Sequence, residues 1–499
     1  MHALAIPLLA AAAALSSASA GAAVFTVSKT ADTADGACDD DCSLREALLA
    51  LPQDPTNVIQ LPAGLYRLTI PRGARPNDNA PGDGTNGNLV VGRVVALVGA
   101  GRDVTVIDAR PAADAPGVDR VFSITNLGAL TISGVTITGG ETLPTGQGGG
   151  VLNLGGGLVM SDVDVVANRA GTGGGGIAVG GDAVTELTRC RITDNVAGSV
   201  EASRPGSGGG IQNIASTMSI ADSTIAGNAA LLASRGGGIQ NLDVSARPNP
   251  PAILTITGST IADNFAGDPR RNTLNEGSGG GIFNSSGRLL LESSTVTGNE
   301  AAPAFVEGFG LLPGSGRGGG VGHQMLLGDD PDDGTTVVNS TIAYNTAHTG
   351  SQVYGFTTFE PLQLANALLA GGAGATPNCA SEGGGVGIES LGGNLGSDAS
   401  PCFFDAAGDQ PNTAPGLDPA LADNGGPTQT IALLEGSAAI GAGLPAHCPE
   451  RDQRGSLRPS PCAVGAIEAP EPGALAAGAI ALAALRARRF WRARRGDPR

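Results

Sequence analysis

Five arginines occupy segments that separate one sequence repeat from the next, and their chemistry suits recognition of oxygen-rich ligands. A guanidinium group offers five N–H donors in a planar fork, which fits a carboxylate or a pair of hydroxyl groups. The five residues are Arg204, Arg235, Arg270, Arg271 and Arg317. They lie in the insertions 198–207, 231–235, 267–278 and 302–317, which should form a row of loops along one edge of the molecule. We predict that this edge binds acidic or hydroxyl-rich polysaccharide, and the alternative is a row of solvated charges.

The densest cluster of carboxylates is the segment GDDPDDG. Its four aspartates are Asp329, Asp330, Asp332 and Asp333. Carboxylate oxygens are ligands that Ca²⁺ prefers, so one interpretation is a calcium site. The other interpretation is an exposed acidic turn. No cofactor other than calcium is expected.

Patterns typical of catalysis are scarce. Glycoside hydrolases need a pair of carboxylates, and lyases need a basic side chain beside an acidic calcium site. The four histidines form no motif, and the only tryptophan is Trp491, so we expect no aromatic platform for sugars. These observations favour a non-catalytic protein. A polysaccharide lyase or glycoside hydrolase is the alternative.

The net charge and the cysteines restrict the partner and the compartment. A formal net charge of −17 disfavours nucleic acid, whose phosphates attract basic surfaces. Seven cysteines in an exported chain indicate disulfides with one thiol left over. Spacing favours the local pairs Cys38–Cys42, Cys379–Cys402 and Cys448–Cys462, although sequence alone leaves the connectivity open. The odd Cys190 is expected in a stack of small inward side chains.

An internal repeat must provide the elements that position these residues. Six segments share the frame apolar-x-apolar-x-x-small-x-apolar-x-x-Asn-x-Ala, and two more fit it without the asparagine. Two pairs of apolar residues at alternate positions, separated by one extra residue, indicate two short strands meeting at a corner. The asparagines are Asn168, Asn195, Asn228, Asn264, Asn299 and Asn345. They lie between 27 residues (Asn168 to Asn195) and 46 residues (Asn299 to Asn345) apart, which suits a large β-solenoid.

Eight such units predict an all-β chain of stacked parallel coils, each burying its inner face against its neighbours. The asparagines are expected to form an internal amide ladder. Runs of three or more glycines precede most coils, where glycine permits positive φ and close stacking. A second ladder should follow these runs, made of Asn153, Asn213, Asn241 and Asn284, with His323 in the same place.

Motifs at both ends of the repeat resemble known families. CSLREAL at Cys42–Leu48 holds a Ser-x-x-Glu capping box for a short helix. Between FTVSKTADTADGAC and IQLPAGLYRL, it resembles the CSLREA-type N-terminus of bacterial right-handed parallel β-helix surface proteins. The choice-of-anchor Q domain is resembled by the segment LDPALADNGGPTQTIALLEGSAAIGAG, which is followed by RDQRGSLRP and CAVGAIE. That family has aspartate where Gly441 stands, and its last phrase is more acidic and aromatic. The GG-[IV] and xxN-x-A phrases are also similar to repeats of polymorphic outer-membrane proteins, which implies adhesion.

The two ends of the chain carry export and sorting signals. An apolar run from Leu4 to Leu15 precedes the small-x-small pattern at Ala18–Ala20, as in a signal peptide. Pro470, Glu471 and Pro472 precede the apolar segment 473–485 and a cluster of arginines. This ending resembles a PEP-CTERM sorting tail, which implies transient membrane retention and removal by an exosortase-type peptidase. The alternative is a permanent C-terminal membrane anchor.

Together these features predict five segments. They are a signal peptide at 1–20, an N-terminal cap at 24–60, β-helix repeats at 61–375, a choice-of-anchor Q-like region at 376–468 and a sorting tail at 469–499. The resemblance implies a right-handed, pectate-lyase-like parallel β-helix with no established reaction. We therefore expect an exported cell-surface or extracellular-matrix protein that binds polysaccharide or mediates adhesion.

Overall fold

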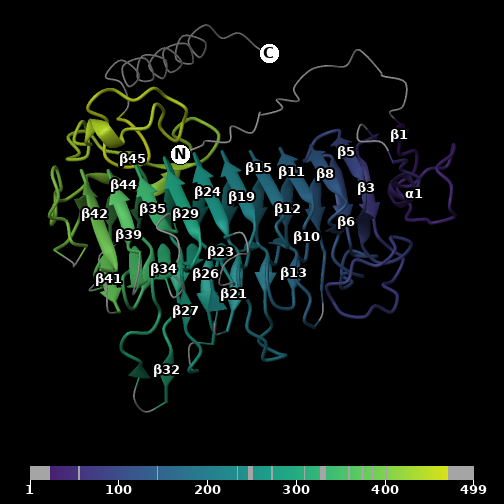
Figure 1. Cartoon of the computed structure of the whole chain (residues 1–499), viewed down its shortest axis with the longest axis horizontal. Coiled ribbons are helices and arrows are strands. Elements are labelled where there is room, and N and C mark those ends of the chain that lie inside the picture. Colours follow the sequence, from purple (N-terminus) through teal and green to yellow (C-terminus); the bar gives the residue numbers. More distant parts are fainter. Residues whose placement is uncertain are drawn as a thin grey trace, which may run out of the picture.

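The computed structural model describes residues 23–53, 57–142, 144–232, 234–244, 251–270, 273–307, 310–325, 333–357, 360–371, 376–383, 386–399 and 402–469. Nearly all of its elements are short strands that pair in parallel from coil to coil. Val151, for example, pairs with Phe122 of the coil before it and with Ile177 of the coil after it. The stacked coils form an elongated parallel β-helix (Figure 1).

A full coil contributes up to four strands, and the equivalent strands of successive coils make four parallel sheets. Sheet 1 has 12 strands: β1 (Val24–Thr26), β2 (Asn57–Leu61), β5 (Val94–Gly99), β8 (Ala129–Ser133), β11 (Gly157–Ser161), β15 (Val184–Thr188), β19 (Thr217–Ala221), β24 (Ile253–Thr257), β29 (Arg288–Glu292), β35 (Gly334–Val338), β39 (Leu362–Ala365) and β42 (Ile388–Gly392). Sheet 2 has 11 strands: β3 (Gly64–Arg67), β6 (Thr105–Asp108), β9 (Thr136–Thr138), β12 (Asp164–Val166), β16 (Arg191–Thr193), β20 (Thr224–Ala226), β25 (Thr260–Ala262), β30 (Thr295–Thr297), β36 (Thr341–Ala343), β40 (Leu368–Ala370) and β43 (Leu395–Gly396).

The other two sheets complete the coil. Sheet 3 has six strands: β13 (Arg169–Ala170), β17 (Val196–Ala197), β21 (Ala229–Leu231), β26 (Phe265–Gly267), β31 (Glu300–Ala301) and β37 (Thr346–Ala347). Sheet 4 has ten strands: β4 (Leu89–Val91), β7 (Phe122–Ile124), β10 (Val151–Leu154), β14 (Ile177–Gly180), β18 (Ile211–Ile214), β23 (Ile239–Leu242), β28 (Ile282–Ser285), β34 (Val321–Met325), β38 (Val353–Thr357) and β41 (Cys379–Glu382).

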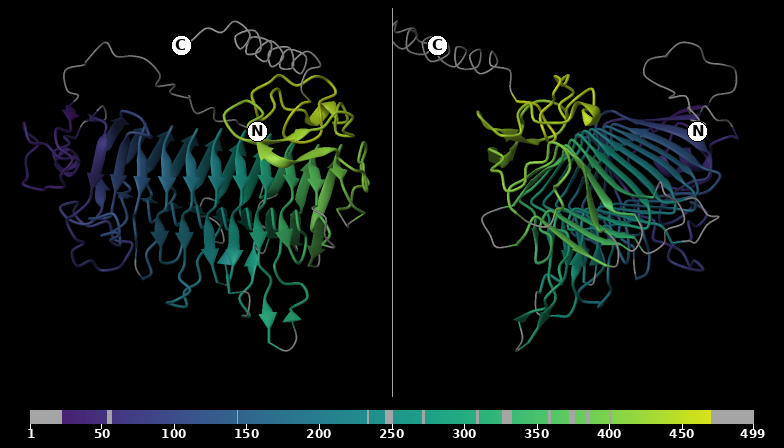
Figure 2. Two further views of the ribbon diagram at one scale, coloured as in Figure 1. Left: turned by 180° about the vertical axis from the view of Figure 1, so that it is seen from behind. Right: turned by 60° about the vertical axis from the view of Figure 1, so that its left-hand side comes forward.

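Short elements outside the sheets close the ends and decorate the loops. They are α1 (Leu44–Leu49), the parallel pair β22 (Ser234–Arg235) and β27 (Gly277–Ser278), the antiparallel pairs β32 (Phe305–Val306) with β33 (Gly310–Leu311) and β44 (Leu417–Ala422) with β45 (Thr430–Leu433), and a 3-10 turn at Pro445–His447. Figure 2 shows the sheets curving round a common axis, with the C-terminal region (yellow) lying along one side of the later coils.

The corner between sheets 1 and 2 is made by the extra residue of the sequence frame. In one coil Leu158 and Met160 point inward from β11, and Val163 and Val165 point inward on the other side of the corner; each is at most 1 % exposed. Asp162 lies between the two pairs with φ +55°, and its left-handed backbone turns the chain. The two apolar pairs therefore both face the core.

The asparagine ladder is present and continuous. Asn228 shows the pattern: its backbone N–H donates to Asn264 Oδ1 over 3.0 Å, and its Nδ2 donates to the same oxygen over 2.9 Å. The last amide, Asn345, is paired with Gln352 Oε1 instead of another asparagine (2.8 Å). A buried serine stack runs beside the ladder, and Cys190 joins it by donating its N–H to Ser223 Oγ (3.0 Å).

The sequence frame undercounts the coils. It identifies eight, whereas sheet 1 has 12 strands within the described residues. The four strands that it misses are β1, β2, β5 and β42, whose coils lack the Asn-x-Ala phrase. Strand pairing therefore continues on both sides of the expected segment boundaries at 60/61 and 375/376, because β2 pairs with β5 and β42 pairs with β39.

The N-terminal end is closed by α1, as its sequence predicts. Ser43 Oγ accepts from the Glu46 N–H (3.2 Å), and the Glu46 carboxylate accepts from the Ser43 N–H (2.8 Å), which completes the capping box. No helix among the described residues is long and apolar enough to cross a membrane. The expected signal peptide and the residues from Pro470 onward lie outside the described residues.

Candidate functional site

The arginine-bearing insertions leave the coils at one corner, as the sequence predicts. They connect strands of sheet 3 to strands of sheet 4; the insertion with Arg235, for example, follows β21 and precedes β23. The loop that carries β32 and β33 projects farthest from the stack (Figure 1). The insertions thus form one edge that runs beside the outer face of sheet 4.

Two of the predicted arginines, Arg235 and Arg317, share one register position on this edge. Arg235 pairs with Ser278 of the next coil, and Ser278 pairs with Arg317 of the coil after that. Each of these residues stands directly before a glycine run. Because parallel strands stack about 4.8 Å apart, the two arginine backbones lie roughly 10 Å apart along the axis.

An aromatic residue lies one coil beyond each arginine. The Arg235 guanidinium carbon is 5.2 Å from the centre of the Phe283 ring, and that of Arg317 is 5.7 Å from the centre of the Tyr354 ring. Both distances fit a cation–π contact. Phe283 and Tyr354 are themselves two coils apart in one register, with Gly322 between them. Two arginine–aromatic pairs therefore lie two coils apart on this edge.

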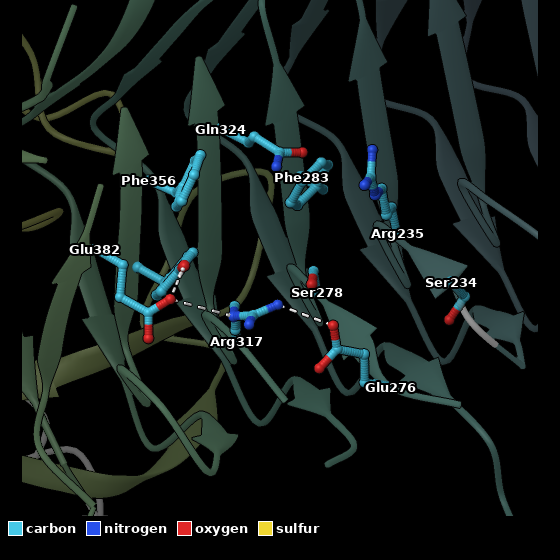
Figure 3. Close-up of a pocket in the computed structure, with 10 residues that line it drawn as sticks. Ser234, Arg235, Glu276, Ser278, Phe283, Arg317, Gln324, Phe356 and Glu382 are labelled. Atoms are coloured by element: carbon cyan, nitrogen blue, oxygen red, sulfur yellow. Dashed lines mark hydrogen bonds and ion pairs between the residues drawn. The ribbon is translucent and has the colours of Figure 1, made fainter. Parts of the chain in front are cut away.

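Two carboxylates complete a pocket around Arg317 (Figure 3). Arg317 Nη1 lies 2.8 Å from Glu276 Oε1, and its Nε lies 3.8 Å from Glu382 Oε2. The Tyr354 hydroxyl donates to Glu382 over 2.8 Å. Burial and this carboxylate raise the pKa of Tyr354, so its hydroxyl stays protonated at neutral pH.

The pocket has a volume of about 230 Å³. It is lined by Ser234, Arg235, Glu276, Ser278, Phe283, Arg317, Gln324, Tyr354, Phe356 and Glu382. Within the described residues Arg235 makes no ion pair. Partial desolvation of its guanidinium lowers its pKa, the charge of Glu276 opposes this shift, and the charge of Arg317 adds to it. Arg235 is exposed, whereas Phe283 and Tyr354 beneath the two guanidinium groups are each only 3 % exposed. A ligand would therefore meet the arginines before the rings.

Of the other predicted site residues, those that the structure describes do not line this pocket. Arg204 donates to the Pro144 carbonyl (3.1 Å) on the same edge. Arg270 binds the buried carboxylate of Asp268 (2.7 Å) and lowers the pKa of that carboxyl group. Arg271, Asp329, Asp330 and Asp332 lie outside the described residues, and Asp333 is described without the rest of its cluster. No group of three or more His, Cys, Asp or Glu side chains among the described residues is arranged to hold a metal.

Sequence reasoning missed the aromatic and carboxylate walls of the pocket. Phe283 and Tyr354 follow their glycine-containing turns at the same offset as Gln212 and Gln240, so an alignment of the turns would have placed them on one face. Glu382 had no such signal, because it lies in β41, beyond the last coil with an Asn-x-Ala phrase. The aromatic side chains of the pocket are buried beneath arginines, so they differ from an exposed platform for sugars.

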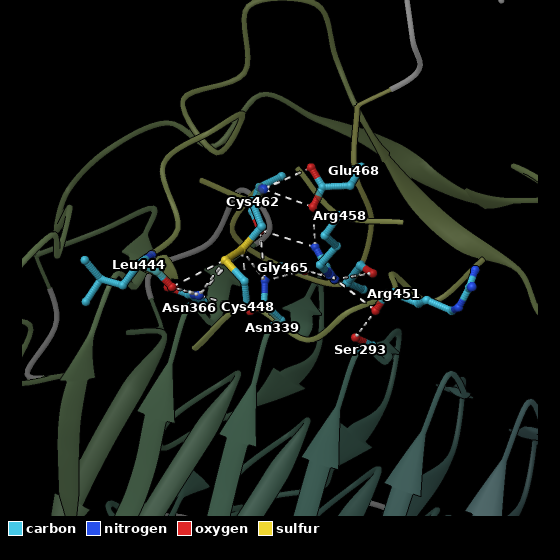
Figure 4. Close-up of a disulfide and its surroundings, with 12 residues drawn as sticks. Ser293, Asn339, Asn366, Leu444, Cys448, Arg451, Arg458, Cys462, Gly465 and Glu468 are labelled. Carbon is cyan, nitrogen blue, oxygen red and sulfur yellow. Dashed lines mark hydrogen bonds and ion pairs between the residues drawn. A yellow bond between two sulfur atoms is a disulfide. The ribbon is translucent and has the colours of Figure 1, made fainter. Parts of the chain in front are cut away.

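The second cluster of buried polar contacts is structural (Figure 4). It surrounds the Cys448–Cys462 disulfide, which forms together with the expected Cys38–Cys42 and Cys379–Cys402 bonds. Asn339 Nδ2 donates to the Ala463 carbonyl (2.9 Å), and Asn366 Nδ2 donates to the Leu444 carbonyl (3.0 Å). These contacts hold the C-terminal region against the corners between sheets 1 and 2. Cys190 remains a free buried thiol, and burial raises its pKa to about 11.

Comparison with known proteins establishes the class of fold. A family model described as a right handed beta helix region matches residues 120–342. The chain folds as a right-handed parallel β-helix. This β-helix is similar to pectate lyase Pel9A, with 15 % identity and a TM-score of 0.47 over 90 % of this chain and 98 % of that chain.

Two further solved structures resemble the β-helix at low identity. One is the A-module of the Azotobacter vinelandii mannuronan C-5 epimerase AlgE4, with 16 % identity and a TM-score of 0.35 over 76 % of this chain and 91 % of that chain. The other is the catalytic domain of a GH87 alpha-1,3-glucanase, with 13 % identity and a TM-score of 0.29 over 73 % of this chain and 68 % of that chain. No curated protein sequence matches the chain. At these identities the likeness concerns the fold alone.

Proposed function

We propose that the β-helix binds an oxygen-rich polysaccharide through the pocket around Arg235 and Arg317 and leaves the polymer chemically unchanged. The observation that carries the proposal is the pair of arginine–aromatic contacts, Arg235 with Phe283 and Arg317 with Tyr354. A guanidinium packed against a ring has fewer accessible positions before a ligand arrives, so less conformational entropy is lost on binding.

The polar groups of the pocket match the chemistry of sugars. A sugar hydroxyl both donates and accepts hydrogen bonds, and the pocket offers donors on its arginines and acceptors on Glu276 and Glu382. Gln324 also reaches the pocket, and its Oε1 is buried with no hydrogen-bond partner within the described residues. A ligand N–H or O–H would satisfy this acceptor.

The same contacts argue against a catalytic role. Tyr354 is protonated and already donates to Glu382, so its hydroxyl is not placed to remove a proton from a sugar. Glu276 and Glu382 both contact Arg317 rather than standing free on either side of an open cleft. Recognition without turnover is the function that this geometry supports best.

The test is a binding screen of the purified protein on acidic and neutral polysaccharides by affinity electrophoresis and isothermal titration. Arg235→Ala and Arg317→Ala should each weaken binding at least tenfold, because each removes a pre-positioned fork. Arg189→Ala is the matched control, since Arg189 is a half-exposed arginine paired with Asp162 at a different corner. Unchanged binding in the Arg235→Ala, Arg317→Ala double variant would refute the proposal.

Polysaccharide cleavage is the second candidate, and the observation that favours it is the presence of two carboxylates, Glu276 and Glu382, in one pocket. The same screen, read for new reducing ends or unsaturated ends, tests it directly. Turnover that disappears in Glu276→Gln or Glu382→Gln would replace the binding proposal with an enzymatic one.

We place this binding at the cell surface or in the extracellular matrix, where adhesion is the related role. The support is the sequence: the signal-like residues 1–20, the CSLREA and choice-of-anchor Q resemblances, and the PEP-CTERM-like tail after Pro470. Cleavage of the tail by an exosortase-type peptidase belongs to the same proposal. Fractionation of the native host, with mass spectrometry of the mature C-terminus, tests it.

A further inference from the structure

A chain of four side-chain amides runs along the outer face of sheet 4 toward the pocket. Asn79 Nδ2 donates to Gln147 Oε1 (3.2 Å), Gln147 Nε2 donates to Gln212 Oε1 (3.0 Å), and Gln212 Nε2 donates to Gln240 Oε1 (2.8 Å). All three bonds point the same way along the axis. Hydrogen bonds aligned in this way polarise one another, so the last amide becomes a stronger donor than an isolated one.

The backbone is adapted to this chain at Gly173. A Cβ atom at this position would lie 2.1 Å from Gln212 Oε1 and 2.7 Å from Gln212 Nε2. Only glycine leaves room for the Gln212 amide to fold over that coil and reach Gln147. The amide chain therefore depends on a specific small residue as well as on the glutamines.

The chain ends on an unused donor. Gln240 is 3 % exposed, and its Nε2 donates no hydrogen bond to any described residue. Its oxygen accepts from Gln212 on the preceding coil, which leaves the N–H bonds of the same amide available to other groups. The residue paired with Gln240 on the following coil is Phe283, the ring that supports Arg235. An amide donor without a protein partner, at the end of a hydrogen-bonded chain, can donate to a ligand.

The charges divide the pocket into two unlike halves. Arg317 has two carboxylates against it, Glu276 and Glu382, so this half carries an excess of negative charge. Arg235 makes no ion pair within the described residues, although the charge of Glu276 acts on it from a distance, and it lies in the same coil as Gln240. An anion is therefore attracted more strongly to Arg235, which has no ion pair, than to Arg317, whose charge two carboxylates already offset.

We infer that Gln240 Nε2 and the Arg235 guanidinium form a subsite for a carboxylate carried by the polysaccharide, while the Arg317 half takes neutral hydroxyls. This inference rests on the proposed function and names its substrate class, a carboxylate-bearing glycan. The Gln240 amide donates to one carboxylate oxygen, and the Arg235 fork donates to the same group from the pocket side. Gln240 acts by direct contact, and Asn79, Gln147 and Gln212 act as positioning residues behind it.

The experiment compares carboxylated polymers with the same polymers after their carboxylates are reduced to primary alcohols. The probes are hyaluronate, alginate and polygalacturonate, each in both forms, titrated against the wild-type chain. At least one carboxylated form should bind, and its reduced form should bind at least tenfold more weakly, because the charge-assisted bonds to Arg235 and Gln240 are lost.

Two substitutions isolate the amide. Gln240→Glu keeps an oxygen that accepts from Gln212 but replaces the free donor with a negatively charged oxygen, and Gln240→Met removes the donor without adding charge. Both should weaken binding of the carboxylated polymer at least tenfold, and the loss should be smaller for the reduced polymer, whose hydroxyl makes no charge-assisted bond in the subsite. Gln60→Glu is the matched control, because Gln60 is an exposed glutamine on sheet 1. Thermal unfolding of each variant checks that the β-helix is intact.

The outcomes separate the inference from the proposed function. If the reduced polymers bind as tightly as the carboxylated ones, or if folded Gln240 variants bind normally while Arg317→Ala does not, the carboxylate subsite is wrong and the glycan-binding pocket stands. If neither these polymers nor any in the wider screen binds the wild type, both are wrong. Selective loss of the carboxylated polymer in both Gln240 variants supports the inference.

Discussion

Acidification should destabilise the β-helix through His323, the ring that replaces an asparagine in the second internal ladder. His323 is fully buried, its Nδ1 lies 3.0 Å from Thr335 Oγ1 and its Nε2 lies 3.0 Å from the Glu360 carbonyl oxygen. A carbonyl can only accept, so Nε2 carries the proton and Nδ1 accepts from the threonine hydroxyl. Both ring nitrogens are satisfied in the neutral form.

Burial lowers the pKa of His323 to about 4, from an unfolded value near 6.5. Between these values the unfolded chain binds more protons than the folded chain, so stability falls as the pH is lowered through this window. With these two pKa values, the loss is about 2 kcal/mol between pH 7 and pH 5, and about 3 kcal/mol by pH 4. Below pH 4 the contribution levels off.

The assay is urea unfolding at pH 7 and pH 5 of the wild type and His323→Asn, which restores the residue type found at the equivalent Asn284. The free energy of unfolding should fall by about 2 kcal/mol more in the wild type than in His323→Asn over this interval, because all other titratable groups are the same in both proteins. His348→Asn is the control, since His348 is exposed. Equal losses in the wild type and His323→Asn would refute the burial argument.

Three further changes should affect stability through separate contacts. Asn264→Ala deletes the acceptor of two Asn228 donors, so the free energy of unfolding in urea should fall by about 2–4 kcal/mol. Asn77→Ala, at an exposed site, is the control and should cost less. Gly279→Ala should cost at least about 1 kcal/mol and weaken glycan binding, because φ is +62° and a Cβ would lie 2.7 Å from Phe283 Cβ. Replacing Cys448 and Cys462 by serine removes the bond that closes a 14-residue loop and should cost about 3 kcal/mol of stability. Limited proteolysis should then cut the C-terminal region faster than in the wild type. Unchanged proteolysis would show that the hydrogen bonds of this region are enough to hold it.

The periodic parts of this structure could be predicted from the sequence because each repeat imposes the same contacts on its neighbours. An amide at one fixed position in every coil has only the equivalent amide above and below it as partners, so spacing alone locates Asn228 against Asn264. The same logic places Cys190 among the serines. The early coils could not be predicted from the repeat, because β2 and β5 bury ordinary apolar residues and use neither the asparagine nor the glycine run.

The pocket was only half predictable, because its members come from coils of unequal length. Arg235 and Arg317 stand directly before glycine runs, and register stacks such positions whatever the length of the insertion before them. Glu276 lies inside an insertion, and Glu382 lies beyond the regular repeat, so neither has a position in the frame. The contact of Glu276 with Arg317 depends on the conformation of a loop, and that of Glu382 depends on how the last coils stack.

Small residues in two successive coils explain why a pocket exists at this place on an otherwise filled face. Ser278 lies between the two arginines, and Gly322 lies between the two rings. A Cβ at Gly322 would come within 2.9 Å of Phe283 Cδ2, so the ring leans into space that any larger residue would occupy. In the coils before the pocket the same register holds Gln212 and Gln240, whose amides fill the face themselves. The pocket therefore begins where the amide chain ends, which is why the last amide and the first arginine are positioned to share one ligand.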